Sequence, residues 1–314
     1  MPYADSLTII LGADGFIGRN LVDTWRGRGW PVYPIGRAGG DFTEASVVDR
    51  LFTQAPRDAG RILHAVTKQR TGSIQYDLQG DLLHDNARIH LNVLEAWRRH
   101  QPQAKLISLG SSCVYPESEK PLPETAFRSG APHASVRGYA LAKEILATGC
   151  EAYGAQYGLR WLHCILATVY GPHAHTQPDR SHFMAALIAR AQATKAKGGH
   201  ELEVWGHPGT VRDLLYVSDQ IDAIIAADQV FENRIVNVTA NDPVTIGACA
   251  EAILRALDWQ QARIVHPQGS FQGAGYKSLD SGRFLASTSW RPKVSLETGV
   301  RQTLATTGEG VQNR

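Results

Sequence analysis

A glycine-rich segment near the start of the chain is the feature that most constrains its fold. The segment, Gly12-Ala13-Asp14-Gly15-Phe16-Ile17-Gly18, directly follows an apolar run at residues 7–11 and opens a helical pattern. Glycines at this spacing permit a tight strand-to-helix turn, and they let the backbone approach a pyrophosphate that the helix N-terminus attracts. A turn that holds no ligand is the alternative. The position between a strand and a helix favours a dinucleotide site.

Apolar runs and helical patterns alternate through the first half of the chain. This alternation is typical of an α/β fold in which helices cover both faces of a doubly wound parallel sheet. The expected strands are residues 7–11, 32–35, 62–66, 105–109 and 161–166, and the expected helices are residues 16–28, 45–54, 77–100 and 139–157. The sequence therefore predicts a Rossmann-type domain in this half.

The alternation of apolar runs and helical patterns becomes less regular after Gly171-Pro172. A loop rich in His, Pro and Asp there leads to an expected helix at 182–193. Residues 213–227 and 234–238 then resemble a strand, a helix and a strand that return to the sheet. We therefore expect an NAD(P)-binding domain of residues 1–168 with 213–238 interleaved. A smaller C-terminal substrate-binding domain would comprise 169–212 and 239–306, followed by a flexible tail at 307–314.

Charge and composition exclude several classes of protein. The 314 residues include 32 Lys and Arg against 30 Asp and Glu, and a net charge of +2 does not suggest a nucleic-acid-binding surface. The longest apolar runs fall far short of the roughly 18 residues of a membrane-spanning helix, and no basic segment followed by an apolar run opens the chain. We expect a cytoplasmic protein with neither nucleic acid nor membrane as partner.

The four cysteines, Cys113, Cys150, Cys164 and Cys249, are few and scattered. No pair has the CxxC spacing of a zinc or redox site, so the sequence predicts neither a disulfide framework nor a metal site. Each is expected to be a buried thiol unless its surroundings indicate chemistry.

The end of the second expected strand bears on the choice between NAD and NADP. It reads Ile35-Gly36-Arg37, without the acidic residue that binds a ribose 2′-hydroxyl, and an arginine there can pair with a 2′-phosphate. Arg37 therefore favours NADP, although Asp14 in the glycine segment would repel a phosphate, and a surface arginine without a ligand is the alternative. Asp41 follows at a distance suited to the adenine, but it can equally start the next helix.

Tyr139 and Lys143 lie four residues apart in one expected helix, so both project from the same face. An ammonium beside a phenol lowers the phenol's pKa and makes it an acid or base near neutrality. Ser111 directly follows the strand at 105–109, at the sheet edge where ligands bind, and can hold a substrate oxygen together with Tyr139. With the glycine segment, these residues resemble the extended short-chain dehydrogenase/reductase superfamily.

The resemblance narrows at Leu109-Gly110-Ser111-Ser112-Cys113-Val114-Tyr115-Pro116, which is similar to the Gly-Ser-Ser-Cys-Ile/Val-Tyr-Pro signature of GDP-L-fucose synthases. These enzymes are NADPH-dependent 3,5-epimerase/4-reductases of GDP-4-keto-6-deoxy-mannose. The similarity covers most of the chain, through Gly138–Lys143, Val169–Pro172, Ser181–Phe183 and Val204–Gly206. It implies the same nucleotide-sugar substrate, the same two-step reaction and the same cofactor here.

The resemblance also implies roles for individual residues. Ser111, Tyr139 and Lys143 would form the reductase triad, Cys113 would be the epimerisation base and His182 the acid. The protons at C3 and C5 of the sugar are acidified by the 4-keto carbon between them, so a thiolate can remove one and an imidazolium can return one to the opposite face. The alternatives are a small buried thiol for Cys113 and a helix-start histidine without function for His182.

The motif and the resemblance together define two sets of binding residues. The cofactor set comprises Gly12, Gly15, Phe16, Ile17, Gly18, Arg37, Asp41, Leu109, Gly110, Tyr139, Lys143, Leu166 and Val169. The substrate set comprises Ser112, Thr168, Arg190, Trp205, Arg212 and Lys277. Within it, Arg190, Arg212 and Lys277 would grip the diphosphate and nucleoside, since guanidinium groups donate paired hydrogen bonds to phosphate. Solvated surface cations are the alternative.

Three departures from the family pattern concern the cofactor and the substrate. Asp14 stands where the family usually has an arginine, and Thr168 stands where an asparagine binds the substrate. The loop at 68–72 is bulkier and more basic than the family's Lys-Val-Gly-Gly. A related enzyme that only epimerises or only reduces, acting for example on a GDP-linked deoxy-heptose or dideoxy sugar, is therefore an alternative.

Two further expectations concern the class of protein and its assembly. A regulatory protein that senses the dinucleotide without turnover is a rival from another class, but such proteins usually lack the Tyr139 and Lys143 pair. The helices at 77–100 and 139–157 are long and amphipathic, and by analogy with the superfamily they would form a homodimer interface.

Overall fold

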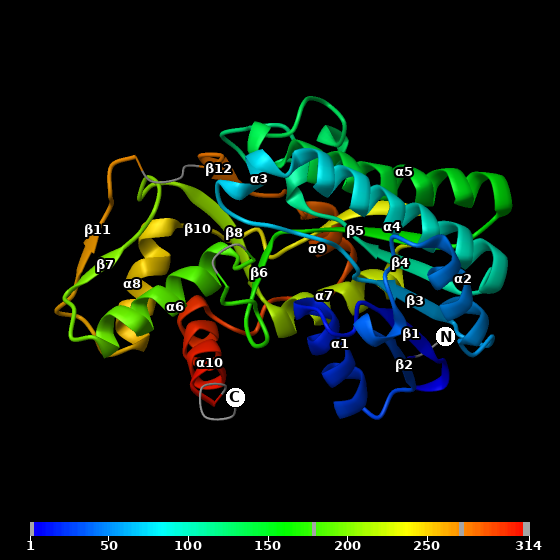
Figure 1. Ribbon diagram of the computed structural model, residues 1–314, viewed down its shortest axis with the longest axis horizontal. Coiled ribbons are helices and arrows are strands. Elements are labelled where there is room, and N and C mark those ends of the chain that lie inside the picture. The colour runs from blue at the N-terminus through cyan, green and yellow to red at the C-terminus, as the bar shows by residue number, and fades with distance from the viewer. Residues whose placement is uncertain (1–2, 178–179, 270–272, 310–314) are drawn as a thin grey trace.

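The computed structural model describes residues 3–177, 180–269 and 273–309, and it consists of a larger and a smaller lobe (Figure 1). The larger lobe contains a six-stranded sheet in the order β2-β1-β3-β4-β5-β9, with every neighbouring pair parallel. Its strands are β1 (Thr8–Leu11), β2 (Val32–Ile35), β3 (Arg61–His64), β4 (Lys105–Leu109), β5 (Trp161–Leu166) and β9 (Arg234–Val238). The order reverses direction at β1, because β2 lies on one side of it and β3 on the other.

Helices cover both faces of this sheet, which confirms the predicted doubly wound α/β fold. One core cluster joins β-strand side chains such as Ile10 to α1 (Phe16–Gly27) and α7 (Val217–Val230). Ile9 and Leu11, which alternate with Ile10 along β1, pack in a second cluster. That cluster joins the opposite face to the helices α2 (Ala45–Gln54), α4 (Gln79–His100) and α5 (Arg137–Tyr157). The alternation follows from the two-residue period of a strand.

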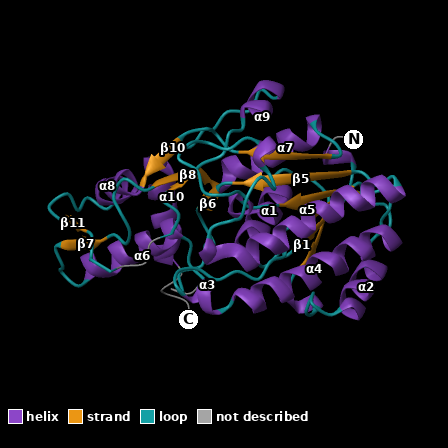
Figure 2. Ribbon diagram, turned by 90° about the horizontal axis from the view of Figure 1, so that it is seen from above, coloured by secondary structure: helices purple, strands orange, loops and turns teal. Residues whose placement is uncertain are grey.

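The smaller lobe is built around a second sheet in which β8 (Val211–Tyr216) is central. Its partners are β6 (Thr168–Tyr170), β10 (Pro243–Thr245) and β12 (Tyr276–Lys277). A separate parallel pair and four helices complete the C-terminal elements (Figure 2). These are β7 (Glu201–Glu203), β11 (Arg263–Val265), α6 (Phe183–Ala196), α8 (Ile246–Ala256), α9 (Gly282–Ser287) and α10 (Leu296–Glu309).

The structure corrects three of the expected elements. The strand expected from residue 213 belongs to β8 in the second sheet, and only α7 and β9 return to the first, because a strand pattern does not specify which sheet it joins. The helix expected at 77–100 is divided at Leu78 into α3 (Ile74–Asp77) and α4. The tail expected from residue 307 is helical as far as Glu309, while residues 310–314 lie outside the described part of the chain.

No helix in the described part of the chain is both long enough and apolar enough to cross a membrane.

Candidate active site

A large cavity lies over the carboxyl ends of β1, β2 and β3, at the point where the strand order reverses. Its volume is about 630 Å³. We call it the cofactor cavity. Its walls include Gly12, Asp14, Gly15, Phe16, Ile17, Gly36, Arg37, Gly40, Asp41, Phe42, residues 65–70, Ile89, His175, Arg180 and His182. Reversal points of parallel sheets are where α/β proteins bind nucleotides.

The glycine turn has the shape that a dinucleotide requires. Gly12 has a φ of +83°, a conformation that side chains disfavour. A Cβ on Gly18 would lie 1.9 Å from the Gly12 carbonyl oxygen, so only glycine lets α1 pack this closely on the turn. No side chain caps the N-terminus of α1, which leaves the positive end of the helix facing the cofactor cavity. A pyrophosphate fits these residues.

Asp14 and Arg37 meet at the end of β2. The Arg37 backbone N–H donates to Asp14 Oδ2 over 2.6 Å, and the Arg37 side chain is exposed at the rim of the cofactor cavity. A carboxylate and a guanidinium therefore share the corner at which ribose 2′ substituents are recognised in this type of fold.

Asp41 lies on the cavity wall and is not the residue that starts the next helix, because α2 begins at Ala45. Its Oδ1 accepts the Thr43 backbone N–H over 2.9 Å, and this hydrogen bond lowers the pKa of the carboxyl. Lys68 Nζ lies 3.8 Å from Asp41 Oδ2 and 2.9 Å from Asp85 Oδ2. The acidic groups of the cavity are thus already engaged by backbone and lysine.

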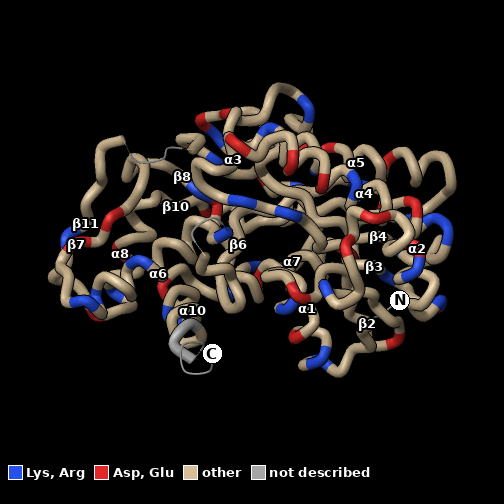
Figure 3. The backbone as a smooth tube through the Cα atoms, in the orientation of Figure 1, with Lys and Arg blue, Asp and Glu red and all other residues tan. Residues whose placement is uncertain are grey.

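The loop after β3 forms one wall of the cofactor cavity, although the sequence identified it only as a departure from the family. Asn86, buried on α4, fixes the loop: its Oδ1 accepts from Thr67 Oγ1 and the Lys68 backbone N–H over 2.9 and 2.8 Å. Figure 3 shows basic positions along this segment, between β3 and α3, where Lys68 and Arg70 stand. The sequence signal that could have identified this loop anchor is a polar residue, Asn86, on the buried apolar face of an amphipathic helix.

Several residues of the expected cofactor set do not line the cavity. Leu166 and Val169 pack in the core beneath it, and Gly18 lies under the glycine turn. Leu109 and Gly110 are buried at the end of β4, where the Leu109 carbonyl accepts from Lys143 Nζ over 2.9 Å. These residues support the site from below.

Ser111, Tyr139 and Lys143 come together at the end of β4, as their spacing predicted. Tyr139 and Lys143 are buried on α5, with Lys143 Nζ 5.7 Å from the centre of the Tyr139 ring. Ser111 and Thr67 both lower the pKa of the Tyr139 hydroxyl, and Thr67 lines the cofactor cavity. The triad therefore adjoins the cavity through Thr67.

The electrostatics of the triad differ from the expectation that Lys143 lowers the phenol pKa. Burial raises the pKa of Tyr139, and the neighbouring Cys113 raises it further, while Thr67 and Ser111 oppose the shift. Burial also lowers the pKa of Lys143 to about 8. Desolvation is the largest cause of both shifts, because both groups lie inside the protein.

Cys113 lies beside the triad and in contact with Lys277. Lys277 Nζ is 2.9 Å from Cys113 Sγ, and the Cys113 backbone N–H donates to Ser111 Oγ. Burial raises the pKa of the thiol, but Lys277, Ser111 and Arg212 together lower it below its ordinary value. We call Ser111, Cys113, Arg212 and Lys277 the thiol site.

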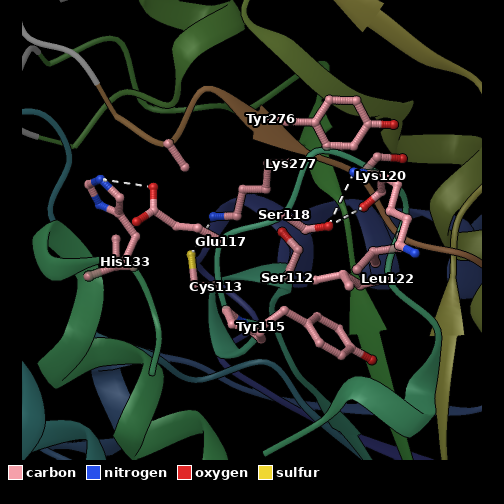
Figure 4. A pocket seen from close by; sticks show the side chains of 15 residues that line it. Ser112, Cys113, Tyr115, Glu117, Ser118, Lys120, Leu122, His133, Tyr276 and Lys277 are labelled. Carbon is pink, nitrogen blue, oxygen red and sulfur yellow. Dashed lines mark hydrogen bonds and ion pairs between the residues drawn. The ribbon is translucent and has the colours of Figure 1, made fainter. Parts of the chain in front are cut away.

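A small pocket of about 30 Å³ adjoins the thiol site (Figure 4). Its lining includes Ser112 and Cys113 from the end of β4 and Tyr276 and Lys277 from β12. Lys277 reaches into this pocket toward Cys113, whereas the family resemblance implied that Lys277 holds the substrate's diphosphate. The pairing of β12 with β8 brings these distant segments together.

His182 is placed at the N-terminus of α6 and lines the cofactor cavity. Burial lowers its pKa to about 4, with smaller contributions from Lys277 and His175. Near pH 7 the imidazole is therefore neutral, which differs from the imidazolium that the sequence analysis assumed.

The remaining substrate residues lie on the smaller lobe. The Arg190 guanidinium stacks 4.1 Å from the centre of the Trp205 ring, and Trp205 is 48% exposed. Such a cation and ring pair can stack against a planar base. Thr168 is half-buried on β6, opposite Leu214, and Arg212 is half-buried on β8 next to Lys277.

Within the described residues, no group of three or more His, Cys, Asp or Glu side chains is placed to hold a metal ion.

Comparison with known proteins identifies sequence relatives that extend over most of the chain. Residues 8–239 match the model of the "NAD dependent epimerase/dehydratase family". GDP-L-fucose synthase 1 of Arabidopsis thaliana is 30% identical over 94% of this chain and 90% of its own.

Solved structures share the fold over nearly the whole chain. A GDP-6-OMe-4-keto-L-xylo-heptose reductase from Campylobacter jejuni superposes with a TM-score of 0.88 at 19% identity, covering 99% of both chains. A GDP-L-fucose synthetase from Naegleria fowleri bound to NADP has a TM-score of 0.87 at 20% identity, covering 100% of this chain and 97% of its own. At these identities the likeness concerns the fold.

Proposed function

The chain belongs to the NAD dependent epimerase/dehydratase family and, within it, to the GDP-L-fucose synthase family, and we propose that it performs both 3,5-epimerisation and 4-keto reduction. It is a nucleotide-sugar epimerase/reductase. The substrate we propose is GDP-4-keto-6-deoxy-mannose and the product GDP-L-fucose. One observation carries the proposal: Cys113, a thiol with a lowered pKa, adjoins Ser111 and the buried pair Tyr139 and Lys143.

Epimerisation needs a base and a place for the charge that develops on the 4-keto oxygen. The Cys113 thiolate removes a proton from C3 or C5, and the proton becomes that of the thiol. The hydroxyls of Ser111 and Tyr139 donate hydrogen bonds to the 4-keto oxygen, which carries the enolate charge. One oxygen site serves both carbons because both lie next to the same carbonyl.

Reduction uses the same oxygen site. A reduced nicotinamide dinucleotide held by the residues of the cofactor cavity would supply the hydride to C4. Tyr139 gives its hydroxyl proton to the oxygen that becomes the 4-hydroxyl, and Lys143, held by the Leu109 carbonyl, stabilises the phenolate that remains. The raised pKa of Tyr139 keeps it protonated until the oxygen becomes basic enough to take the proton.

His182 completes the epimerisation by returning a proton to the opposite face. The neutral state of His182 near pH 7 opposes that role, and the nearby charge of Lys277 contributes to the lowered pKa. The diphosphate of a bound nucleotide sugar brings negative charge, which raises the pKa of a neighbouring imidazole. We propose that His182 becomes protonated when the substrate binds.

Reduction without epimerisation is the second candidate activity. The lowered pKa of His182 favours it, because a neutral imidazole is a weak acid.

Deuterium incorporation separates the two activities. Purified protein is given GDP-4-keto-6-deoxy-mannose and NADPH in deuterated water, and the mass and stereochemistry of the product are determined. Carbon-bound deuterium at both C3 and C5 of a reduced product is expected. Cys113→Ser should lose the deuterium and keep the reduction. Reduction without exchange in the wild type supports the second candidate, and no turnover rejects this substrate.

We propose NADPH as the reductant, with Arg37 at the rim of the cofactor cavity pairing with the 2′-phosphate. The Asp14 carboxylate in the same corner weakens that preference. Titration of the protein with NADPH and NADH, followed by cofactor fluorescence, measures it directly. An NADH affinity equal to or above that for NADPH rejects the proposal.

The homodimer expected from the sequence is retained as a proposal. Leu91 of α4 and Leu141 and Tyr157 of α5 are each at least 44% exposed, although these two helices pack against each other. Sedimentation velocity tests it, and Leu141→Glu should shift the sedimentation coefficient toward that of a single chain.

A further inference from the structure

The side chain of Lys277 directly contacts the thiol of Cys113. Its Nζ lies 2.9 Å from Sγ, well within the distance of a hydrogen bond to sulfur. Cys113 is also the one cysteine of the four that is not buried, all four being described in the structure. The contact joins positions 164 residues apart.

The structure holds Lys277 in place from two sides. On one side, β12 pairs with β8, and Lys277 lies opposite Arg212. On the other, Leu122 bridges to Leu279, and the Leu122 backbone N–H donates to the Ser278 carbonyl over 3.2 Å. The chain on either side of the Lys277 contact therefore has little freedom.

Asp213 anchors the same segment from below. Its buried carboxylate accepts from Ser278 Oγ and the Leu279 backbone N–H, each over 3.3 Å, and from Thr239 Oγ1 over 2.7 Å. The two residues that follow Lys277 are thus tied to a strand of the second sheet. A lysine fixed at its backbone loses less side-chain freedom when it holds one partner.

Lys277 has no competing anionic partner. No carboxylate lies within ion-pair distance of its ammonium in the described part of the chain. Glu117, which lines the same small pocket, lies instead 3.8 Å from His133 Nε2 (Figure 4). The Lys277 ammonium contacts the sulfur of Cys113.

We propose that Lys277 keeps Cys113 ionised as the base for epimerisation, rather than gripping the substrate's diphosphate. This rests on the proposed function, in which Cys113 removes the sugar proton. On ionisation the thiol proton passes to solvent, the ammonium keeps its own three protons, and the ion pair remains. Lys277 then stabilises a thiolate in a site from which water is largely excluded.

Other charged groups also face the sulfur. Arg212 from β8 favours the thiolate, and Lys143 from α5 interacts with it as well, whereas burial opposes ionisation. Tyr139, also on α5, stays uncharged because its own pKa is raised. Lys277 is the nearest cation and makes the largest of the favourable contributions. Removing it should therefore shift the balance toward the thiol.

The thiol pKa can be measured without substrate or cofactor. The rate of Cys113 alkylation by iodoacetamide is followed against pH, with the modified peptide identified by mass spectrometry. Lys277→Met should raise the pKa and slow alkylation at pH 7 about tenfold or more, since one pKa unit is a tenfold change in thiolate. Lys277→Arg, which keeps the charge, should retain most of the lowered pKa.

Lys120→Met is the matched control. Lys120 is exposed, lines the same small pocket and makes no charged contact with the sulfur, so its removal should leave the profile unchanged. A Lys277→Met profile that superimposes on the wild type overturns the proposal, as does a Lys277→Arg protein whose thiol titrates at its ordinary pKa. A shift of the same size in the thiol pKa of Lys120→Met also overturns the proposal.

A double-variant cycle separates this role from diphosphate binding. If Lys277 acts through Cys113, Lys277→Met should slow deuterium exchange by about the same factor as alkylation, and it should cause no further loss of reduction, in kcat or KM, when added to Cys113→Ser. If it grips the diphosphate, the KM for reduction rises in both backgrounds, which overturns the inference. The alkylation result stands even if the protein does not epimerise, so failure of the proposed function is distinguishable.

Discussion

The cofactor cavity and the thiol site lie side by side but are assembled differently. The strand-end loops of the cavity follow β1, β2 and β3, all within the first 70 residues. Among the described lining residues, Ile89 comes from α4, and His175, Arg180 and His182 come from far along the chain. The thiol site joins Cys113 to Lys277 across 164 positions. Consecutive loops of one sheet can form a cavity by themselves, whereas the thiol site exists only when the second sheet has formed.

The two regions also differ in charge. In the cofactor cavity, Asp14 and Asp41 accept backbone N–H groups, and Lys68 neutralises Asp41. The thiol site brings Lys277 and Arg212 to one sulfur without a carboxylate among its members. The cavity therefore combines carboxylates with basic side chains, while the thiol site has cations alone around a group that can become an anion. The following experiments test that contrast.

Tyr139→Phe should produce the largest effect and leave the cofactor cavity intact. The substitution removes the acid for reduction, so kcat for reduction should fall by about 10²–10⁴-fold. NADPH affinity, measured by fluorescence titration, should change less than about threefold because Tyr139 does not line the cavity. Tyr153→Phe, which removes a hydroxyl farther along α5, is the control. Loss of NADPH binding in Tyr139→Phe would contradict the separation of the two regions.

Gly18→Ala should do the reverse. The added Cβ would lie 1.9 Å from the Gly12 carbonyl oxygen, so α1 must move away from the glycine turn. Overpacking of this kind costs about 1–3 kcal/mol of unfolding free energy. NADPH affinity and thermal stability should both fall, while the pH profile of Cys113 alkylation stays as in the wild type. Gly27→Ala is the control, since a Cβ there meets no atom within 4 Å.

Acid should destabilise the floor of the cofactor cavity. His64, which ends β3 below the cavity loop, and His163 on β5 are buried, and burial lowers the pKa of each to about 3. The unfolded chain takes up their protons below about pH 6.5 while the folded chain does not. Stability is therefore complete above that pH and falls by about 1.4 kcal/mol per pH unit for each histidine as the pH drops toward 3.

Urea unfolding at pH 7.5 and pH 5 measures this loss. His163→Gln should reduce the difference in unfolding free energy between pH 7.5 and pH 5 by the contribution of one histidine, since glutamine does not titrate. His84→Gln, at a side chain that is 63% exposed, should leave the difference as it is in the wild type. An unchanged pH dependence in His163→Gln would show that this imidazole is protonated in the folded protein.

Asp14→Asn should have the smallest effect and confine it to the cofactor cavity. Removing the carboxylate from the corner that it shares with Arg37 should raise NADPH affinity relative to NADH about tenfold. Asp23→Asn, within α1 and farther from the glycine turn, is the matched control. A preference that does not move would show that Asp14 has no part in choosing between the cofactors.

The sequence was most informative where function depends on neighbouring positions. The glycine turn and the Tyr139 and Lys143 pair could be predicted, because three residues within one turn and two residues four apart on a helix have fixed relative positions. Five of the six parallel strands followed from the alternation of apolar runs and helical patterns, and the sixth, β9, from the later strand pattern at 234–238. The division of the long helix at Leu78 and the membership of β8 had no such local signal.

Two properties of the site were decided only by the tertiary structure. One is the contact between Lys277 and Cys113, which depends on the pairing of β12 with β8 and on Asp213 beneath it. The other is the ionisation of Tyr139, Lys143 and His182, which burial changes in a direction that spacing does not reveal. Backbone periodicity is a local property of the chain, whereas desolvation and long-range charge contacts arise only when distant segments pack together.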